Sequence, residues 1–347
     1  MLNSVCIMRL SALGDVTHVI PVVKSLQAQA PGIAITWVIG KLEAKLVGDL
    51  PGVEFIVFDK KAGLEGYKAL RRAMRGRHFD ALLHMQVSLR ANLAAALIPA
   101  TIKVGYDKAR SKDLHSLFIN RRIASEAEQH VRDCLASFLD PLVLVPAPPR
   151  WHIPLNDADY SLAREYCAQD CINFVISPCA SHALRNWSSQ RYAQLADYAV
   201  VAHGANVILV GSPAEFEKTI CREIEDLMNE KVVNICGQDT LKQLTALLER
   251  ADLLVSPDSG PAHIANAMGT DVLGLYAASN PDRSGPYNSL AWCVNCYPDA
   301  LHKFTGKTVS QARWGAKAEF EGAMDMISLD DATDQLDLWM EKRFKSA

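Results

Sequence analysis

Several signatures of common protein classes are missing from this chain of 347 residues. No apolar run reaches the roughly 18–20 residues that a membrane-spanning helix requires, and Arg9 interrupts the early apolar stretch, so we expect no secretory leader. The nine cysteines are odd in number and scattered, which argues against a disulfide framework and favours a reducing cytoplasm. The sequence also lacks G-x-G-x-x-G and G-x-S-x-G, which disfavours a dinucleotide-dependent dehydrogenase and an α/β-hydrolase.

Neither sign of charge dominates the whole chain, but the two halves differ. The net charge is −3 at pH 7. Residues 1–155 hold 20 Lys and Arg against 13 Asp and Glu, a balance of +7, and residues 156–347 hold 16 against 26, a balance of −10. A basic half is typical of a protein with an anionic partner, although two solvated surfaces of different composition explain the same count.

Short apolar runs alternate with segments of helical spacing, and the alternation occurs twice along the chain. Strands that alternate with helices indicate a parallel, doubly wound sheet, so we predict an α/β fold with two Rossmann-like domains. The expected strands are 5–8, 33–39, 53–58, 81–85 and 102–104 in the first half, and 173–177, 206–210, 232–235, 253–256 and 272–275 in the second. The best-defined helices are expected at 15–29, 158–168, 188–202, 213–229, 240–250 and 260–268.

A proline-rich segment separates the two halves. The stretch Asp140–Arg150 carries four prolines, which remove backbone donors and stiffen the chain. We therefore predict domains at 1–150 and 151–325, followed by an amphipathic helix within 326–347. Ligands of such sheets bind beyond the carboxyl ends of the strands, so two such domains suggest a cleft between them.

The first strand–helix junction carries a carboxylate. Residues 11–18 read Ser-Ala-Leu-Gly-Asp-Val-Thr-His, which places Asp15 beyond the carboxyl end of a strand, where a general base can face a ligand. The same residue could instead be an ordinary first-turn acid that stabilises the positive end of the helix.

Two junctions in the second half suit an anion. Residues 176–187 include Ser181 and Arg185, whose hydroxyl and guanidinium groups can contact phosphate, although Arg185 could simply pack over Trp187. Residues 255–263 read Val-Ser-Pro-Asp-Ser-Gly-Pro-Ala-His, and the N–H groups at such a helix start can hold a diphosphate.

Three acidic or basic side chains of these junctions have a structural alternative. Asp258 could be a plain N-cap, and His263 could be a buried histidine with internal partners. Glu215 follows another strand, where it could accept hydrogen bonds from ribose hydroxyls or act as a first-turn acid. Metal sites are not expected, because Cys293 and Cys296 have zinc-knuckle spacing without a second pair nearby.

Together these junctions resemble the ADP-heptose:lipopolysaccharide heptosyltransferases of glycosyltransferase family 9, in particular heptosyltransferases I and II. The resemblance spans nearly the whole chain. Residues 11–21 are similar to the family's N-terminal motif, Arg185-Asn-Trp187 to its basic–x–Trp element, and residues 258–263 to its D-[ST]-G-x-x-H motif. Leu275-Tyr276 followed by Asn280-Pro281 also matches, whereas Ala277-Ala278 replaces the usual Gly-Pro.

The resemblance implies a GT-B fold with a central cleft and an inverting transfer that needs no metal and no cofactor. It assigns Asp15 as the catalytic base and Arg185 as the basic side chain that contacts the donor phosphate. It also implies that the C-terminal helix crosses back to the N-terminal domain. The donor-binding residues that it implies are Ser181, Glu215, Asp258, Ser259, Gly260, Pro261, Ala262 and His263.

The implied substrates are ADP-heptose and an anionic lipopolysaccharide inner-core acceptor, bound at the cytoplasmic face of the inner membrane by a peripheral protein, with no nucleic acid partner. In this family the N-terminal half takes the acceptor, which agrees with its positive charge. A GT-B transferase or epimerase that uses another nucleotide sugar remains an alternative, as does a non-catalytic relative that binds nucleotide or glycan. Candidate acceptor contacts are Gly14, His18, Arg71, Arg72, Arg75, Lys108, Arg110 and Lys112, with Arg77 and Lys103 as further basic side chains.

Overall fold

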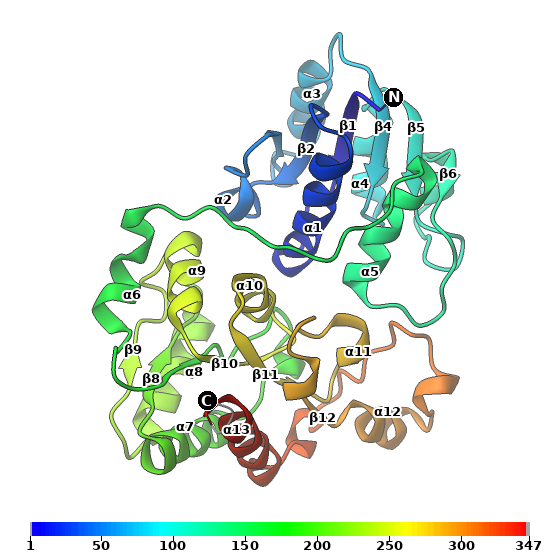
Figure 1. Cartoon of the computed structure of the whole chain (residues 1–347). Helices are drawn as coiled ribbons and strands as arrows, with labels where there is room; N and C mark the ends of the chain where they lie inside the picture. Colours follow the sequence, from blue (N-terminus) through cyan, green and yellow to red (C-terminus); the bar gives the residue numbers. More distant parts are fainter. Residues whose placement is uncertain (1, 345–347) are drawn as a thin grey trace. The chain divides into compact units, whose positions relative to one another are not determined.

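The computed structural model describes residues 2–344 of the chain. Its contacts divide the described chain into two compact units, with the boundary between Pro154 and Leu155. Each unit contains a six-stranded, all-parallel sheet with helices on both faces (Figure 1). The predicted fold class, two doubly wound parallel α/β sheets, is therefore confirmed.

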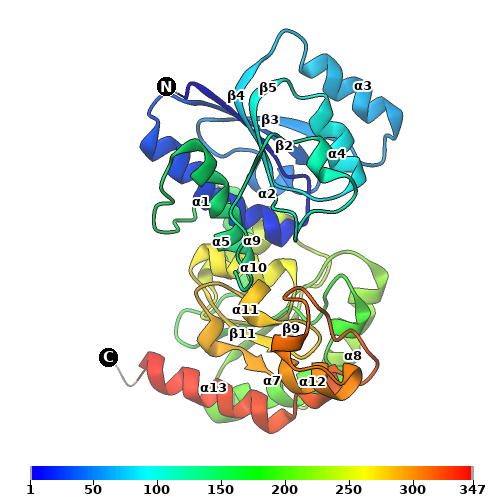
Figure 2. The same ribbon diagram turned by 90° about the vertical axis from the view of Figure 1, so that its right-hand side faces the viewer.

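The first sheet has the order β3-β2-β1-β4-β5-β6. Figure 2 shows α1 and α5 on one face of this sheet and α3 and α4 on the other. The strands are β1 (Ser4–Met8), β2 (Ala34–Gly40), β3 (Val53–Phe58), β4 (Phe79–His84), β5 (Ala100–Gly105) and β6 (Arg121–Arg122). The helices are α1 (Leu13–Gln29), α2 (Ala44–Val47), α3 (Leu64–Ala73), α4 (Leu89–Ala96) and α5 (Val131–Ala136).

The second sheet has the order β12-β11-β10-β7-β8-β9. Its strands are β7 (Asn173–Ile176), β8 (Asn206–Leu209), β9 (Val233–Asn234), β10 (Leu253–Pro257), β11 (Asp271–Tyr276) and β12 (Val294–Asn295). The helices of this unit are α6 (Ser161–Tyr166), α7 (Ser189–His203), α8 (Glu215–Leu227), α9 (Leu241–Arg250), α10 (Gly260–Met268), α11 (Pro281–Ser284), α12 (Tyr297–Thr305) and α13 (Leu329–Phe344).

The two sheets share one topology. Counted from the start of each unit, the strands of both sheets run in the order 3-2-1-4-5-6, in which the winding reverses between the first and fourth strands. That reversal lies between β1 and β4 in the first unit and between β7 and β10 in the second. Because ligands of doubly wound sheets bind beyond the carboxyl ends of the strands at this point, the loops after these four strands are where a site is expected.

The elements predicted from hydrophobic periodicity are present with small shifts at their ends. In α1, for example, the apolar positions Val16, Val19, Ile20 and Val23 are all buried, as helical spacing predicts. Strands β6 and β12 were not predicted, because each has only two residues and two residues carry no periodicity. Pairing with the longer neighbours β5 and β11 makes them strands.

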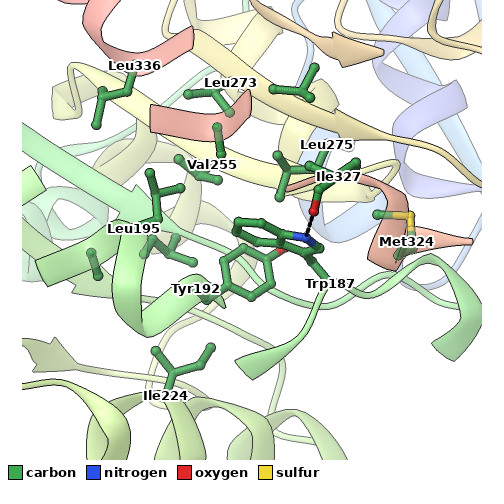
Figure 3. Close-up of a cluster of buried hydrophobic side chains, with 14 of the residues drawn as sticks. Trp187, Tyr192, Leu195, Ile224, Val255, Leu273, Leu275, Met324, Ile327 and Leu336 are labelled. Atoms are coloured by element: carbon green, nitrogen blue, oxygen red, sulfur yellow. Dashed lines mark hydrogen bonds between the residues drawn. The ribbon is translucent and has the colours of Figure 1, made fainter. Parts of the chain in front are cut away.

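An apolar core fixes the loop that precedes α7 in the second unit (Figure 3). Trp187 is buried with its ring edge against Tyr192, at a centroid distance of 5.2 Å. Its Nε1–H donates to the carbonyl of Ile327 at 3.0 Å. Leu195, Val255, Leu273 and Leu275 complete this part of the core. The loop residues just before Trp187 are therefore held against the carboxyl end of the sheet.

Helix α13 packs within the second unit, alongside α7 (Figure 2). The buried side chains of Ala332, Leu336 and Trp339 form its apolar face, as their helical spacing predicts. The indole N–H of Trp339 donates to Asp271 Oδ2 at 2.8 Å. These contacts anchor α13 to the sheet of the second unit, and its crossing to the first unit stays a prediction.

Candidate active site

Asp15 lies in the first turn of α1, beyond the carboxyl end of β1. Its Oδ2 accepts from the backbone N–H of Ala12 at 3.2 Å and forms an ion pair with Arg9. The side chain is 31% exposed, and within residues 2–344 its second oxygen, Oδ1, has no hydrogen-bond or ion-pair partner. Asp15 is thus a first-turn acid, as one interpretation predicted, and still offers one carboxylate oxygen to a ligand.

Arg9 fixes Asp15 to the point where the sheet reverses its winding. The buried guanidinium donates to the carbonyl of Met85, which follows β4, and to the hydroxyl of Tyr106 at 3.4 Å. Burial lowers the pKa of Arg9 and is the largest single influence, but the negative charge of Asp15 and the hydrogen bonds to Asp15 and Tyr106 together outweigh it, so the pKa lies above its ordinary value. Arg9 therefore stays charged and holds the carboxylate in one orientation.

The loop after β7 directs Arg185 toward two carboxylates. Arg185 ends a 3₁₀ turn, Ala183–Arg185, that precedes the buried Trp187. Its Nε donates to Glu319 Oε1 at 2.7 Å, and its NH1 lies 3.4 Å from Asp258 Oδ2. The guanidinium of Arg185 thus pairs with carboxylates, and the arginine that lies over the Trp187 ring is Arg191.

Asp258 is the centre of this cluster. Its side chain is 10% exposed, and Lys317 Nζ donates to its Oδ2 at 3.1 Å. Burial alone would raise the pKa of Asp258, but the positive charges of Lys317, His263 and Arg185 reverse the shift and leave the pKa below its ordinary value. Asp258 is therefore an ionised carboxylate that holds two cations beside the end of β10.

The start of α10 lies directly after Asp258. Ser259 is the N-cap, and its hydroxyl accepts from the N–H of Ala262 at 3.4 Å. Pro261 has no N–H, and the N–H of Gly260 remains as a donor at the first helical turn. His263 is buried, with Nε2 3.9 Å from Asp258 Oδ1. A helix start, two cations and a buried carboxylate thus lie together at the carboxyl edge of the second sheet, an arrangement that suits a phosphate group.

Lys317 and Glu319 are members of the cluster that the motifs did not reveal. Lys317 lies 59 residues from Asp258 along the chain, and Glu319 lies 134 residues from Arg185. The one local signal is their spacing of two, which puts both side chains on the same side of an extended segment. Nothing in that spacing identifies their partners.

The acidic side chain at the end of β8 is Glu217, two residues after the one predicted. Glu215 is exposed on α8 and pairs with Arg222 at 2.9 Å. Glu217 instead turns back to the strand, where Oε2 accepts from the N–H of Ser212 at 2.8 Å and Oε1 from its hydroxyl at 2.5 Å. The predicted ribose contact therefore suits Glu217 better than Glu215. Ser181 lies exposed in the loop after β7.

Two predicted acceptor contacts on α1 are buried. Gly14 is packed inside the first turn, where its carbonyl accepts from the hydroxyl of Thr17 at 2.7 Å. The ring of His18 is 2% exposed and lies edge-on to His130, with centroids 5.6 Å apart. Both residues support α1, and their contact with an acceptor stays a prediction.

The arginines in and just after α3 lie at the opposite end of the strands from Asp15. Helix α3 leaves the carboxyl end of β3 and returns to the amino end of β4, so its last turn lies at the opposite edge. Arg71, Arg72 and Arg75 line a hollow of about 950 Å³ there, together with Lys68. Arg77 forms a two-point ion pair with Glu54. These side chains therefore lie at the opposite end of the strands from Asp15, and their contact with an acceptor stays a prediction.

The loop after β5 does lie at the same edge as Asp15. Lys108 and Lys112 are exposed in this loop. Arg110 pairs with Asp107 and donates to Gln129 Oε1 at 2.8 Å, so it supports the loop. Its contact with an acceptor stays a prediction. Lys103 lies within β5 itself.

Two buried histidines hold this loop on the sheet. His84 Nε2 and His115 Nδ1 both contact Asn92 Oδ1, at 2.8 and 2.9 Å. His115 Nε2 accepts from the N–H of Tyr106 at 3.1 Å, so the ring is neutral with its proton on Nδ1. Asn92 in turn donates to the carbonyl of Asp113 at 2.6 Å. The network joins α4 to the loop that carries Lys108 and Lys112.

This network predicts acid sensitivity of the first unit. Burial, together with the neighbouring His115, lowers the pKa of His84 to about 3, and burial lowers that of His115 to about 4. An unfolded histidine has a pKa near 6.5, so the stability contributed by the neutral rings is complete above pH ~6.5 and is lost as the pH falls toward 4. We expect hydrogen exchange in residues 107–118 to accelerate between pH 6.5 and 4.5, after correction for intrinsic rates. A doubly substituted H84Q/H115Q protein should lose most of this pH dependence, and an equal dependence in both proteins would contradict the assignment.

The described residues contain neither a metal-binding cluster nor a membrane-spanning helix. Within residues 2–344, no group of three or more His, Cys, Asp or Glu side chains is arranged to hold a metal ion. None of the helices described combines the length and the apolar character needed to cross a bilayer.

Comparison with known proteins places the chain in a family. The family described as glycosyltransferase family 9 (heptosyltransferase) matches residues 67–311. The lipopolysaccharide core heptosyltransferase OpsX of Haemophilus influenzae is 39% identical over 334 residues, which are 96% of each protein. A glycosyl transferase family 9 structure from Veillonella parvula has a TM-score of 0.75 at 22% identity and covers 96% of this chain and 97% of its own. E. coli heptosyltransferase WaaC with ADP has a TM-score of 0.66 at 21% identity and covers 87% and 99%.

The fold is therefore the GT-B fold of glycosyltransferases. The chain is a member of glycosyltransferase family 9, the heptosyltransferases. The resemblance stated from the motifs is confirmed, and a non-catalytic or epimerase function is not favoured.

Proposed function

We propose that this enzyme transfers a heptose from ADP-heptose to the inner core of lipopolysaccharide, with inversion and without a metal ion. The observation that carries the proposal is the cluster around Asp258, where Arg185 and Lys317 flank a helix start at the carboxyl edge of the second sheet. Such a cluster supplies fixed positive charge to a diphosphate, which is the part of the donor that leaves. The names of OpsX and WaaC support heptose as the sugar and ADP as the nucleotide.

In the proposed reaction the first unit supplies the base and the second unit stabilises the leaving group. Asp15 Oδ1 accepts the proton of the acceptor hydroxyl while the hydroxyl oxygen attacks the anomeric carbon. The bond from that carbon to the β-phosphate oxygen breaks, and its electrons stay on the departing ADP. Arg185 and the N–H of Gly260 stabilise the new charge, as preorganised donors do in a water-poor site. The reaction requires that Asp15 and this donor cluster act on the same pair of substrates.

The two basic regions of the first unit suit different anions. Lys108 and Lys112 share the edge of Asp15, so we assign them to the charged groups of the acceptor near the reacting hydroxyl. The arginines of α3 lie at the other edge around a hollow with an apolar floor of Met74, Leu97 and Pro99. We assign them to anionic lipid at the inner membrane surface, where each cation contributes about 1 kcal/mol.

Replacing Arg71 and Arg72 of α3, together with Arg75 just after it, by Gln should separate these assignments. We expect vesicle binding with 30% anionic lipid to weaken at least about 10-fold at 0.1 M salt, while turnover of a detergent-free, truncated acceptor changes less than twofold. The control is a triple substitution at exposed lysines of the second unit, Lys231, Lys303 and Lys307. Unchanged vesicle binding by the α3 variant would contradict the membrane assignment.

Turnover with defined substrates tests the proposed function itself. ADP-heptose, other ADP-sugars and UDP-sugars are offered with lipopolysaccharide cores truncated at successive sugars, and ADP release and the lengthened core are both measured. We expect turnover with ADP-heptose and with one truncation in preference to the others. Release of nucleotide from another donor alone, or none from any donor, would contradict the proposal.

A further inference from the structure

We propose that Lys317 is a second catalytic cation, one that contacts the β-phosphate of the leaving diphosphate. This inference deepens the proposed function and rests on it for the identity of the sugar, but not for the diphosphate contact. The residue lies in the segment after α12, far from the three motifs. Its ammonium group nevertheless meets the same Asp258 carboxylate as Arg185 does.

The segment around Lys317 is anchored on both sides. The hydroxyl of Tyr297 donates to the carbonyl of Ala316 at 3.0 Å. The N–H of Ala318 donates to the carbonyl of Ala278 at 2.9 Å, and Ala318 is fully buried. Because side chains alternate along an extended segment, burial of Ala318 turns Lys317 and Glu319 together toward Asp258 and Arg185. The position of the ammonium group is thus fixed by packing and not by the ion pair alone.

The cluster holds more positive charge than its own carboxylates need. Arg283 lies against Gly315 and adds a third cation to Arg185 and Lys317, while Asp258 and Glu319 are the two carboxylates that pair with them. Burial lowers the pKa of Lys317, Asp258 raises it in part, and Arg185 and Arg283 lower it further, so that the pKa ends below its ordinary value. A cation that is held by one carboxylate and repelled by two neighbours gains from an additional anion. A diphosphate supplies that anion.

In the proposed reaction, negative charge develops on the β-phosphate, the group that we assign to Lys317. When the bond between the anomeric carbon and the β-phosphate oxygen breaks, the electron pair remains on that oxygen and the diphosphate gains one negative charge. In enzymes without a metal ion, fixed cations must stabilise this charge. Asp258 and Glu319 then serve to hold Lys317 and Arg185 in place before the donor arrives. Lys317 is assigned to the β-phosphate because it acts together with Arg185 at the same carboxylate.

Nucleotide binding tests the contact without any sugar. Calorimetry is performed on the full-length protein and its K317M variant with ADP and AMP, and with UDP and UMP in case the base differs. We expect K317M to weaken binding of the preferred diphosphate at least about 10-fold and that of the matching monophosphate less than twofold, because only the diphosphate carries a β-phosphate. K317R should recover part of the loss. The control is K307M, since Lys307 is exposed in the same segment.

The binding results decide whether Lys317 contacts the β-phosphate. If K317M weakens the binding of diphosphate and of monophosphate equally, Lys317 has a structural role and the proposal is overturned. Diphosphate binding that K317M leaves unchanged would also overturn it, and so would the absence of diphosphate binding by the unsubstituted protein. If the unsubstituted protein binds ADP but does not turn over ADP-heptose, the proposed function fails while the Lys317 contact is still decided by the binding data. If it does turn over, K317M should lower kcat by about 10²–10³-fold with little change in KM for the acceptor.

Discussion

Replacing Asp15 by Asn is expected to lower kcat by about 10²–10⁴-fold, which corresponds to roughly 3–5 kcal/mol in the barrier. The amide has nearly the size of the carboxylate and can still accept from Arg9 and from the N–H of Ala12. It cannot take the proton of the acceptor hydroxyl. The loss should therefore appear in kcat, while KM for the donor and the affinity for ADP stay within about twofold.

The test of Asp15 needs a stability control, because the carboxylate also supports the start of α1. Urea unfolding of D15N should show that the protein is folded at the assay temperature. The matched substitution D170N changes an exposed aspartate of the second unit and should leave kcat unchanged. A folded D15N protein with turnover close to that of the unsubstituted enzyme would show that Asp15 is not the base.

Replacing Arg185 by Met is expected to lower kcat/KM for the donor by about 10²–10³-fold. The substitution removes the guanidinium that pairs with Asp258 and Glu319, and so the fixed charge that we assign to the leaving phosphate. R185K should recover only part of the activity, since an ammonium group keeps the charge but not the planar array of donors.

Arg191 provides the control for Arg185. Its guanidinium lies 6.0 Å from the centroid of the Trp187 ring and donates to the carbonyls of Asp325 and Ile327. R191M should therefore lower the free energy of unfolding, with kcat/KM changed by less than twofold. Equal losses of activity in R185M and R191M would indicate that both arginines only support the fold.

Most of the secondary structure could be predicted because it depends on local patterns. The run Val53–Phe58 is a strand with the predicted bounds, and the helix 260–268 begins where Ser259 and Pro261 indicate. The motifs around Asp15, Arg185 and Asp258 could also be found, since each follows a strand directly and the topology brings the ends of neighbouring strands together.

The contacts that complete the site could not be predicted, since they join distant parts of the chain. Lys317 and Glu319 meet Asp258 and Arg185 only because the segment after α12 returns to the sheet edge, where Ala318 bonds to Ala278. No sequence pattern within this segment predicts that it packs against the carboxyl end of the sheet.

Geometry that the sequence does not contain also bears on two other site predictions. Glu215 and Glu217 are two residues apart on a helix and so point to opposite sides, which means that a shift of two residues moves the acid from the strand end to solvent. The arginines in and just after α3 were chosen as acceptor contacts by their charge. Helix α3 runs from the carboxyl ends of the strands to their amino ends, and the charge of a residue does not indicate at which end it lies.

The most direct test of the account is the transfer of radiolabelled heptose from ADP-heptose to lipopolysaccharide cores truncated at successive sugars, with the anomeric configuration of the product determined. The account predicts one preferred core, inversion at the anomeric carbon, release of one ADP for each heptose transferred, and activity that persists in excess EDTA. Retention of configuration, or loss of activity in EDTA that an added divalent ion restores, would contradict it.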